Sequence, residues 1–272
     1  MAGRWERAAA GWARRADRIR DHGMPVSAWL IDHLSLQPGE RVLELAAGPG
    51  DTGFLAAELI APAGTLISSD ASEPMLEVAR ERSQKLGVEN VEFRRLELEW
   101  IDLETASVDA ALCRWGLMLT VDPDAALHEI RRVLRPGGRM AIAVWDGPDR
   151  NPWATVWGRP LVELGHMPAP DRSAPGMFAL ADPERLAERI QDAGFVDVVV
   201  ESIEIPRTYT AVEQYVSEQL DLSAAFTEVW EGLSEDQRAV VTQRVARLAQ
   251  PYERPDGTIT FPAAALVAAA SA

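Results

Sequence analysis

Several kinds of chemistry are nearly absent from this sequence. Its 272 residues include one cysteine, Cys113, and one lysine, Lys85. A single cysteine excludes an intramolecular disulfide and a zinc site built from several cysteines. Apolar runs are far shorter than the roughly 18 residues of a membrane-spanning helix, and the N-terminal residues lack the apolar stretch of a signal peptide. These absences favour a location in the reducing cytoplasm.

Positive charge is also scarce. The 27 lysines and arginines are outnumbered by 42 aspartates and glutamates, which gives a formal net charge of −15. Nucleic-acid backbones and anionic membrane surfaces bind clustered cations, so we expect neither as a partner and favour a small molecule. The histidines are spaced unlike metal ligands, so we expect no metal site. They are His22, His33, His128 and His166.

Short apolar runs alternate with helical patterns from about residue 40 onward. The predicted strands are 41–47, 65–69, 91–95, 108–114 and 139–145. The helices between them are 52–60, 74–86 and 123–134. This alternation predicts βαβ units with right-handed crossovers and a mainly parallel sheet, which is an α/β fold.

The rest of the chain adds segments to this core. A helix is predicted at 182–193, a strand at 195–205 and a last strand at 258–269. We divide the chain into an N-terminal helical cap segment, residues 1–35, and a main domain, residues 36–272. The main domain would carry helical cap insertions at about 146–180 and 208–250.

A glycine loop joins the first predicted strand to the helix that follows it. Gly48, Gly50 and Gly53 satisfy the pattern G-x-G-x-x-G, and Asp70 ends the second strand. Glycines let the backbone approach a ligand, and an acid at the end of the second strand can accept hydrogen bonds from ribose hydroxyls. The pattern indicates an adenosine-containing cofactor without separating a dinucleotide from other adenosine compounds.

Three further features make the assignment more specific. Glu44 lies inside the first strand, Glu97 follows the third, and Leu-Arg-Pro-Gly-Gly precedes the fifth at 134–138. With them the sequence resembles the class I S-adenosylmethionine (SAM)-dependent methyltransferases, and in particular the ubiquinone/menaquinone biosynthesis branch. The matching segments are 38–53, 64–80, 91–99, 107–118 and 129–142.

The resemblance implies a fold and a reaction. The fold would be a Rossmann-like, seven-stranded, mostly parallel sheet with its last strand antiparallel, flanked by helices. The reaction would transfer a methyl group from SAM to a small apolar or aromatic molecule, on oxygen, carbon or nitrogen, and leave S-adenosylhomocysteine. The protein would be a monomer or a homodimer.

The resemblance also implies which positions bind the cofactor. The methionine end would lie among Glu44, Ala46, Gly48, Gly50, Cys113 and Arg114. The ribose would bind Asp70, and adenine would lie beside Ala71, Met75, Glu97 and Leu98. Several of these positions also have a purely structural interpretation. Gly48 and Gly50 could be plain turn glycines, and Asp70 a solvated strand end. Arg114 could pack at the edge of the fourth strand, Met75 could be a core residue, and Glu97 could be part of an acidic surface.

The acceptor site has weaker signals. Trp12, Trp115 and Trp153 lie in cap or loop positions, where aromatic side chains suit an apolar pocket, although core packing explains them as well. Asp146, just after the fifth strand, is a further polar candidate. His22 and His166 lie in cap segments and are the candidates for a general base near neutral pH, with exposed loop histidines as the alternative.

Other functions fit parts of the pattern. A nicotinamide-dependent dehydrogenase would have an apolar residue at position 44 and a Tyr-x-x-x-Lys pair, which Lys85 cannot supply. An RNA or protein methyltransferase is disfavoured by the net charge and by the sequence Cys-Arg-Trp-Gly-Leu-Met after the fourth strand, which lacks an Asn/Asp-Pro-Pro-Tyr/Phe motif. A protein that binds SAM without transferring its methyl group remains open.

Overall fold

The computed structural model describes residues 2–171 and 174–272. Residue 1 of the predicted N-terminal segment and residues 172–173 of the predicted 146–180 insertion lie outside the described residues. Within the described part of the chain, no helix is both long and apolar enough to cross a membrane.

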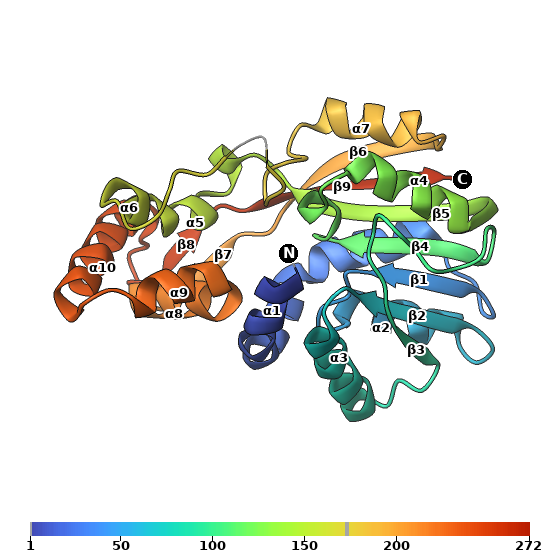
Figure 1. Cartoon of the computed structure of the whole chain (residues 1–272), viewed down its shortest axis with the longest axis horizontal. Coiled ribbons are helices and arrows are strands. Elements are labelled where there is room, and N and C mark those ends of the chain that lie inside the picture. Colours follow the sequence, from blue (N-terminus) through green and yellow to red (C-terminus); the bar gives the residue numbers. More distant parts are fainter. Residues whose placement is uncertain (1, 172–173) are drawn as a thin grey trace.

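The core is one seven-stranded sheet (Figure 1). Its strands are, in spatial order, β3 (Val91–Arg95), β2 (Thr65–Asp70), β1 (Arg41–Leu45), β4 (Val108–Arg114), β5 (Leu134–Trp145), β9 (Ala264–Ser271) and β6 (Val196–Glu204). All neighbours pair in parallel except β9, which runs antiparallel to both β5 and β6. The expected seven-stranded, mostly parallel sheet is therefore confirmed.

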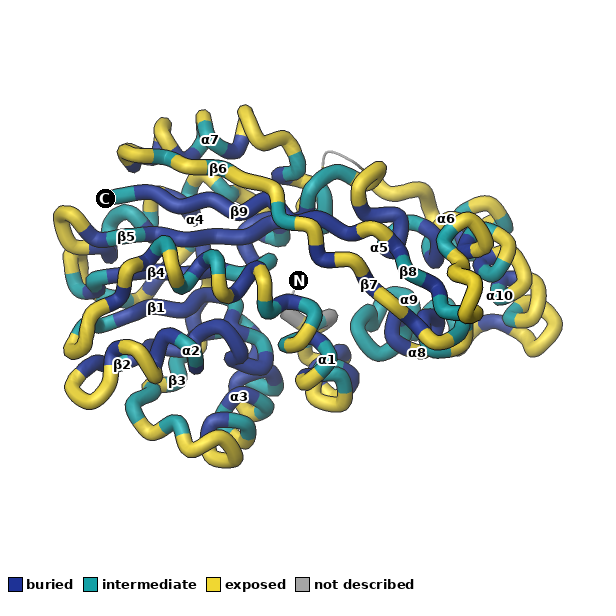
Figure 2. Tube along the Cα trace, turned by 180° about the vertical axis from the view of Figure 1, so that it is seen from behind, coloured by how far each residue is buried: buried dark blue, intermediate teal, exposed yellow. Residues whose placement is uncertain are grey.

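Helices cover both faces of this sheet. Helices α1 (Ala2–Leu34), α2 (Asp51–Ile60) and α3 (Glu73–Leu86) pack together on one face, and α4 (Pro123–Val133) packs with α7 (Pro183–Asp192) on the other. Strands covered on both faces are continuously apolar, and Figure 2 shows β1, β4, β5 and β9 as the buried centre of the molecule. The carboxyl ends of β1 and β4, where ligands bind in such folds, point toward the junction with α1.

The predicted last strand, 258–269, is wrong as a single strand. The structure has two strands there, β8 (Ile259–Phe261) and β9, which belong to different sheets. Pro262 lies between them and has no N–H for a ladder hydrogen bond, so pairing stops at that point. The alanines of β9 leave room for α1 and α7 to pack over its two faces.

A second group of elements, which we call the cap lobe, lies beyond the ends of β5 and β6 (Figure 1). It consists of α5 (Pro152–Thr155), α6 (Gly158–Glu163), β7 (Arg207–Tyr209), α8 (Val212–Leu222), α9 (Ala224–Glu231), α10 (Glu235–Ala249) and β8, with β7 and β8 paired antiparallel. Short 3-10 helices lie at Leu117–Leu119, Pro148–Arg150 and Gln250–Tyr252. The division into a cap segment and a main domain stays a prediction.

Asn151 fastens the cap lobe to the sheet. Its side chain is fully buried. The amide nitrogen donates to the carbonyl oxygens of Asp146 and Ala264, both at 2.9 Å. The amide oxygen accepts from the Trp153 indole at 3.0 Å and from the Ala264 N–H at 3.1 Å. One side chain therefore joins the end of β5, the start of β9 and α5.

Helix α1 bridges the two parts of the molecule. On the cap side, Arg15 donates to Asp221 at 2.6 Å and Arg18 donates to Glu218, both on α8. On the sheet side, the Trp29 indole donates to Glu201 of β6 at 3.0 Å. The N-terminal helix thus lies across the junction where the predicted site residues gather.

Candidate active site

The glycine loop connects β1 to α2 at the centre of the sheet. Ala46, Gly48 and Gly50 have φ values of 50°, 53° and 85°, in the left-handed region that favours glycine. A Cβ atom added at Gly48 would meet nothing within 4 Å. The loop backbone is therefore accessible to a ligand at Gly48.

Glu44, on β1, is hydrogen-bonded to the end of the glycine loop. Its buried carboxylate accepts hydrogen bonds from the Gly53 N–H at 2.7 Å and the Ser68 hydroxyl at 3.1 Å. A Cβ atom at Gly53 would overlap this carboxylate, so the third glycine of the motif is required by close approach. Burial raises the pKa of Glu44 to about 7 despite these hydrogen bonds.

Asp70 faces the same loop from the end of β2. Its two carboxylate oxygens accept from the Gly48 N–H at 3.0 Å and the Ser72 N–H at 2.9 Å. Burial raises its pKa, and the two backbone donors oppose that change. Each oxygen keeps a lone pair for a further donor, which is what two ribose hydroxyls require.

The residues predicted to bind adenine lie around the ends of β2 and β3. β2 and β3 pair in parallel up to Asp70 and Arg95, and just beyond Arg95 the Leu96 N–H donates to the Asp70 carbonyl at 3.2 Å. Met75 and Leu98 are buried, whereas Glu97 is exposed in the turn that the Trp100 N–H closes on its carbonyl. The exposed carboxylate of Glu97 can accept from an amino group at this edge.

The loop after β4 closes the other side of the glycine loop. A Cβ atom at Gly116 would overlap the side chains of Ala46 and Cys113, so the two loops are in contact. Burial raises the pKa of the Cys113 thiol to about 12. Cys113 is therefore a neutral packing group beside the site.

Arg114 is the buried cation of this region. Its side chain is 8% exposed, and its Nη2 lies 3.8 Å from Oδ2 of Asp51. The other carboxylate oxygen of Asp51, Oδ1, pairs with Arg82 at 2.6 Å. Desolvation lowers the pKa of Arg114, while the Asp51 carboxylate opposes that change. Its Nη1 has no partner and lies against Gly23 of α1, where a Cβ atom would overlap it.

A wall of aromatic side chains leads from this loop into the cap lobe. The rings of Trp115 and Trp145 stack with centroids 4.5 Å apart, and Trp145 meets Trp153 edge to face at 5.0 Å. The guanidinium of Arg207, on β7, lies 4.0 Å above the Trp153 ring. The wall therefore runs from the glycine loop to β7.

Charged side chains meet at the cap end of that wall. Glu218 is 1% exposed; it accepts from Arg18 and from the Tyr209 hydroxyl at 2.8 Å, and lies 3.3 Å from Nη2 of Arg207. We call Arg18, Arg207 and Glu218 the arginine–glutamate cluster. His22 on α1 is next to it: burial, followed by the charges of Arg207 and Arg18, lowers the pKa of His22 to about 4.

Buried polar atoms without a hydrogen-bond partner concentrate along this junction. Within the described residues, such side-chain atoms belong to Asp51, Ser72, Arg82 and Arg114 on the glycine-loop side and to His22, Trp115, Arg207 and Gln219 on the cap side; Arg139 and Trp157 have the others. Folded proteins leave few buried polar groups unpaired. Such a concentration is typical of a site that binds a polar ligand.

Three predicted site residues lie elsewhere or have other partners. The Trp12 indole donates to the Leu222 carbonyl at 3.2 Å. Trp12 lies about 16 Å along α1 from Gly23, where this helix meets Arg114. His166 follows α6, which packs on α10 within the cap lobe. The Asp146 carboxylate accepts from the Ser202 hydroxyl at 2.9 Å and the Gly147 N–H at 2.7 Å. The site roles of these three residues stay predictions.

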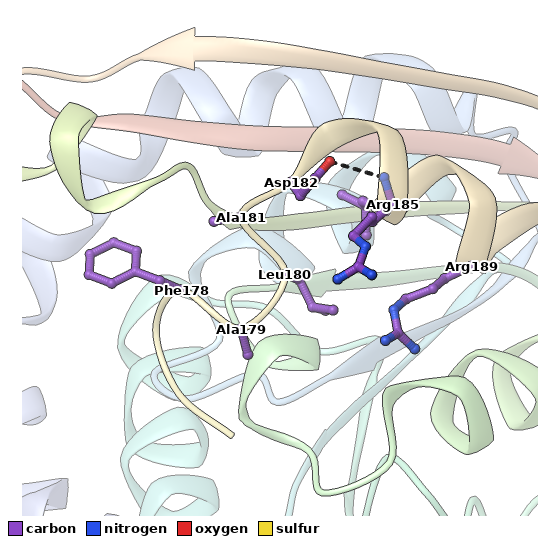
Figure 3. Close-up of a pocket in the computed structure, with 8 residues that line it drawn as sticks. Phe178, Ala179, Leu180, Ala181, Asp182, Arg185 and Arg189 are labelled. Atoms are coloured by element: carbon purple, nitrogen blue, oxygen red, sulfur yellow. Dashed lines mark hydrogen bonds between the residues drawn. The ribbon is translucent and has the colours of Figure 1, made fainter. Parts of the chain in front are cut away.

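A separate pocket of about 310 Å³ lies at the N-terminus of α7 (Figure 3). Its lining includes Phe178, Leu180, Arg185 and Arg189, and Asp182 caps the helix by accepting from the Arg185 N–H at 3.1 Å. Arg189 pairs with Asp124 of α4. The pocket shares none of its residues with the glycine loop or the aromatic wall.

Sequence reasoning missed Trp145, Arg207 and Glu218. Trp145 was visible as the last residue of a predicted strand, the position from which side chains reach a site in parallel sheets. Arg207 and Glu218 lie in the predicted 208–250 insertion or next to it, without a motif around them. In the described part of the chain, no three His, Cys, Asp or Glu side chains are grouped to hold a metal ion.

Comparisons with known proteins agree with this geometry. The sequence model of the methyltransferase domain family matches residues 36–156. The chain is 30% identical over 178 residues to the ubiquinone/menaquinone biosynthesis C-methyltransferase UbiE of Escherichia coli, which covers 62% of this chain and 71% of that enzyme.

Two further proteins are similar over different lengths. An uncharacterized 37.1 kDa protein in a transposon of Streptomyces fradiae is 41% identical over 120 residues, 43% of this chain. The match spans only 34% of that relative's length. The crystal structure of the YcgJ protein from Bacillus subtilis superposes with a TM-score of 0.61 at 19% identity, over 90% of this chain and 97% of that one, which is a likeness of fold.

Proposed function

Because the chain belongs to the class I SAM-dependent methyltransferases, we propose that it transfers the methyl group of SAM to a small aromatic or apolar molecule. The observation that carries this proposal is the glycine loop held between Glu44 and Asp70, with open space at Gly48. The aromatic wall that begins beside the loop supports an aromatic acceptor.

The residues of the site fit the cofactor's groups. Asp70 would accept from the ribose hydroxyls, while Glu97 and Leu98 would face adenine beside Ala71 and Met75. At the methionine end, the carboxylates of Glu44 and Asp51 would suit an ammonium, and Nη1 of Arg114, which has no hydrogen-bond partner, would suit a carboxylate. The backbone of Ala46, Gly48, Gly50 and Cys113 would line that end.

The bound cofactor would supply a methyl group activated by the adjacent sulfonium, and S-adenosylhomocysteine would leave. Any proton released by the acceptor would pass to a base or to water. The protein contributes alignment and a dry site. The aromatic wall and α1 would exclude water from the transfer.

His22 is the candidate proton acceptor that lies beside the arginine–glutamate cluster. With a pKa of about 4 it is neutral at pH 7, and its Nδ1 has no partner. Its lowered pKa makes it a weak base, so we infer that it orients the acceptor's proton by hydrogen bonding. An acceptor with an acidic O–H would need no stronger base.

The test is calorimetric titration with S-adenosylhomocysteine, with NAD as a control ligand. We expect micromolar binding of S-adenosylhomocysteine, a loss of at least tenfold in Asp70→Ala, and unchanged affinity in Asp146→Ala, whose carboxylate faces β6. Preference for NAD, or Asp70→Ala binding as tightly as the natural protein, would contradict the proposed cofactor site. Binding without methyl transfer to any acceptor would indicate a SAM-binding protein that does not methylate.

We expect the protein to be a monomer or a homodimer located in the cytoplasm.

A further inference from the structure

The arginine–glutamate cluster holds more positive than negative charge. Arg18 and Arg207 share one carboxylate, Glu218, so the three side chains have a net charge of +1. Tyr209 is a neutral donor to Glu218, and His22 is neutral. Arg18 is 27% exposed and also donates to the Thr208 carbonyl at 2.7 Å, so solvent meets part of its charge. Arg207 is the buried arginine of the cluster.

Arg207 is the member of the cluster that has a buried donor without a hydrogen-bond partner. Its side chain is 7% exposed and its Nε is buried without a hydrogen-bond partner. One face of its guanidinium covers the Trp153 ring at 4.0 Å, and Nη2 faces Glu218. The remaining N–H donors of a guanidinium suit a carboxylate, whose two oxygens match its fork.

This cation is connected to the proposed methyl-transfer site by aromatic rings. From Arg207 the wall passes through Trp153 and Trp145 to Trp115, whose neighbour Gly116 touches the glycine loop at Ala46. A planar molecule lying along this wall would hold one end near the glycine loop and the other near Arg207.

We propose that the methyl acceptor is an aromatic carboxylate and that Arg207 binds its carboxylate group. This inference rests on the proposed methyltransferase function and adds the class of acceptor. A carboxylate fits better than a phenolate, because a carboxylic acid is ionised at neutral pH whereas a phenol with a pKa near 10 is not. Arg207 is then a specificity-determining residue at the end of the acceptor away from the methyl group.

The experiment compares matched acceptors that differ only in charge. Protein saturated with S-adenosylhomocysteine is titrated with 2-hydroxybenzoate, 4-hydroxybenzoate and 3,4-dihydroxybenzoate, and with the amide of each. We expect at least one carboxylate to bind at least tenfold more tightly than its amide. Arg207→Met should bring that ratio close to one, and Arg207→Lys should retain part of it.

Two controls separate this inference from others. Arg189→Met removes an arginine that pairs with Asp124 on the α4–α7 face and should leave the ratio unchanged. All variants should bind S-adenosylhomocysteine within twofold of the natural protein, which also reports that they fold. If Arg207→Met does not fold, Arg207→Gln and Arg207→Lys give the same comparison.

Three outcomes would overturn the proposal. They are equal binding of every carboxylate and its amide, binding of neither, and a carboxylate preference that survives loss of the Arg207 charge. In each case, intact binding of S-adenosylhomocysteine would leave the proposed methyltransferase function unaffected. Arg207 and Glu218 would then have a structural role, in which they join α1 to the cap lobe. Loss of S-adenosylhomocysteine binding by the natural protein would instead contradict the proposed function itself.

Discussion

Replacing Glu44 with glutamine should change how the stability of the protein depends on pH. Folding raises the pKa of Glu44 from 4.5 to about 7, chiefly because the carboxyl group is buried. A carboxyl group that binds its proton more tightly in the folded state contributes stability that is complete below pH 4.5 and is lost as the pH rises through about 7. Glutamine keeps the shape of the side chain and does not titrate.

The size of the effect follows from the two pKa values. One pH unit corresponds to about 1.4 kcal/mol, so moving from 4.5 to about 7 corresponds to about 3 kcal/mol. Glu44 is 3% exposed, so solvent screens this term little. Relative to Glu44→Gln, the free energy of unfolding of the natural protein should fall by about this amount between pH 4.5 and 8 and stay level above.

Urea unfolding at several pH values between about 4.5 and 8.5 measures this difference. Subtracting the two proteins cancels the titration of all other groups. Glu92→Gln, the same substitution at an exposed carboxylate of β3, is the matched control. A flat difference for Glu44→Gln would mean that Glu44 is already ionised in the fold, and would refute the argument from burial.

The same carboxyl group should couple proton release to cofactor binding. If Glu44 faces the methionine ammonium, as proposed, binding of S-adenosylhomocysteine ionises its carboxyl group. The affinity for S-adenosylhomocysteine should then rise by up to about tenfold for each pH unit as the pH increases toward 7. Calorimetry at pH 6 in two buffers of different ionisation enthalpy should detect the released proton in the natural protein. Glu44→Gln should release none, and equal heats in both buffers for the natural protein would argue against this role.

Three further predictions address single contacts. Gly53→Ala places a methyl group on the Glu44 carboxylate; it should cost about 1–3 kcal/mol in urea unfolding and weaken S-adenosylhomocysteine binding, and an unchanged affinity would contradict the close approach. Asn151→Ala leaves the buried groups of Ala264 and Trp153 unpaired and should cost about 3 kcal/mol; a cost below about 1 kcal/mol would count against its role in joining the lobes. The Cys113 thiol, with its pKa raised to about 12, should resist iodoacetamide at pH 8 until the protein unfolds, whereas rapid modification of the folded protein would show that it is accessible.

The parts of the molecule that could be predicted from sequence depend on local spacing. The glycine loop, the alternation of strands and helices, and an acid at the end of β2 are patterns within stretches of a few tens of residues. They place Glu44, Gly48 and Asp70 together, and the structure joins them by hydrogen bonds. Short-range patterns were therefore enough for the fold and for bringing these three residues together, while their binding of the cofactor stays a prediction.

The proposed acceptor half of the site depends on contacts between distant residues. Arg18 and Glu218 are 200 residues apart, and Arg207 meets Trp153 across two different insertions. Nothing in the periodicity of α1 or α8 indicates which of their charged residues face each other. Trp12 illustrates the same limit, because its position in a cap segment did not reveal that its indole is bound to the Leu222 carbonyl.

The placement of β9 between β5 and β6 has a consequence for the order of folding. Strand β6 has only β9 as a neighbour, so it cannot join the sheet until residues 264–271 have been synthesised. The strands of the cofactor half, β1 to β5, are complete more than 100 residues earlier in the chain, and contacts close in sequence form first. A nascent chain should therefore gain a cofactor-binding half while the cap lobe is still an unclosed loop, and β9 would be the element whose pairing fixes both ends of that loop at once.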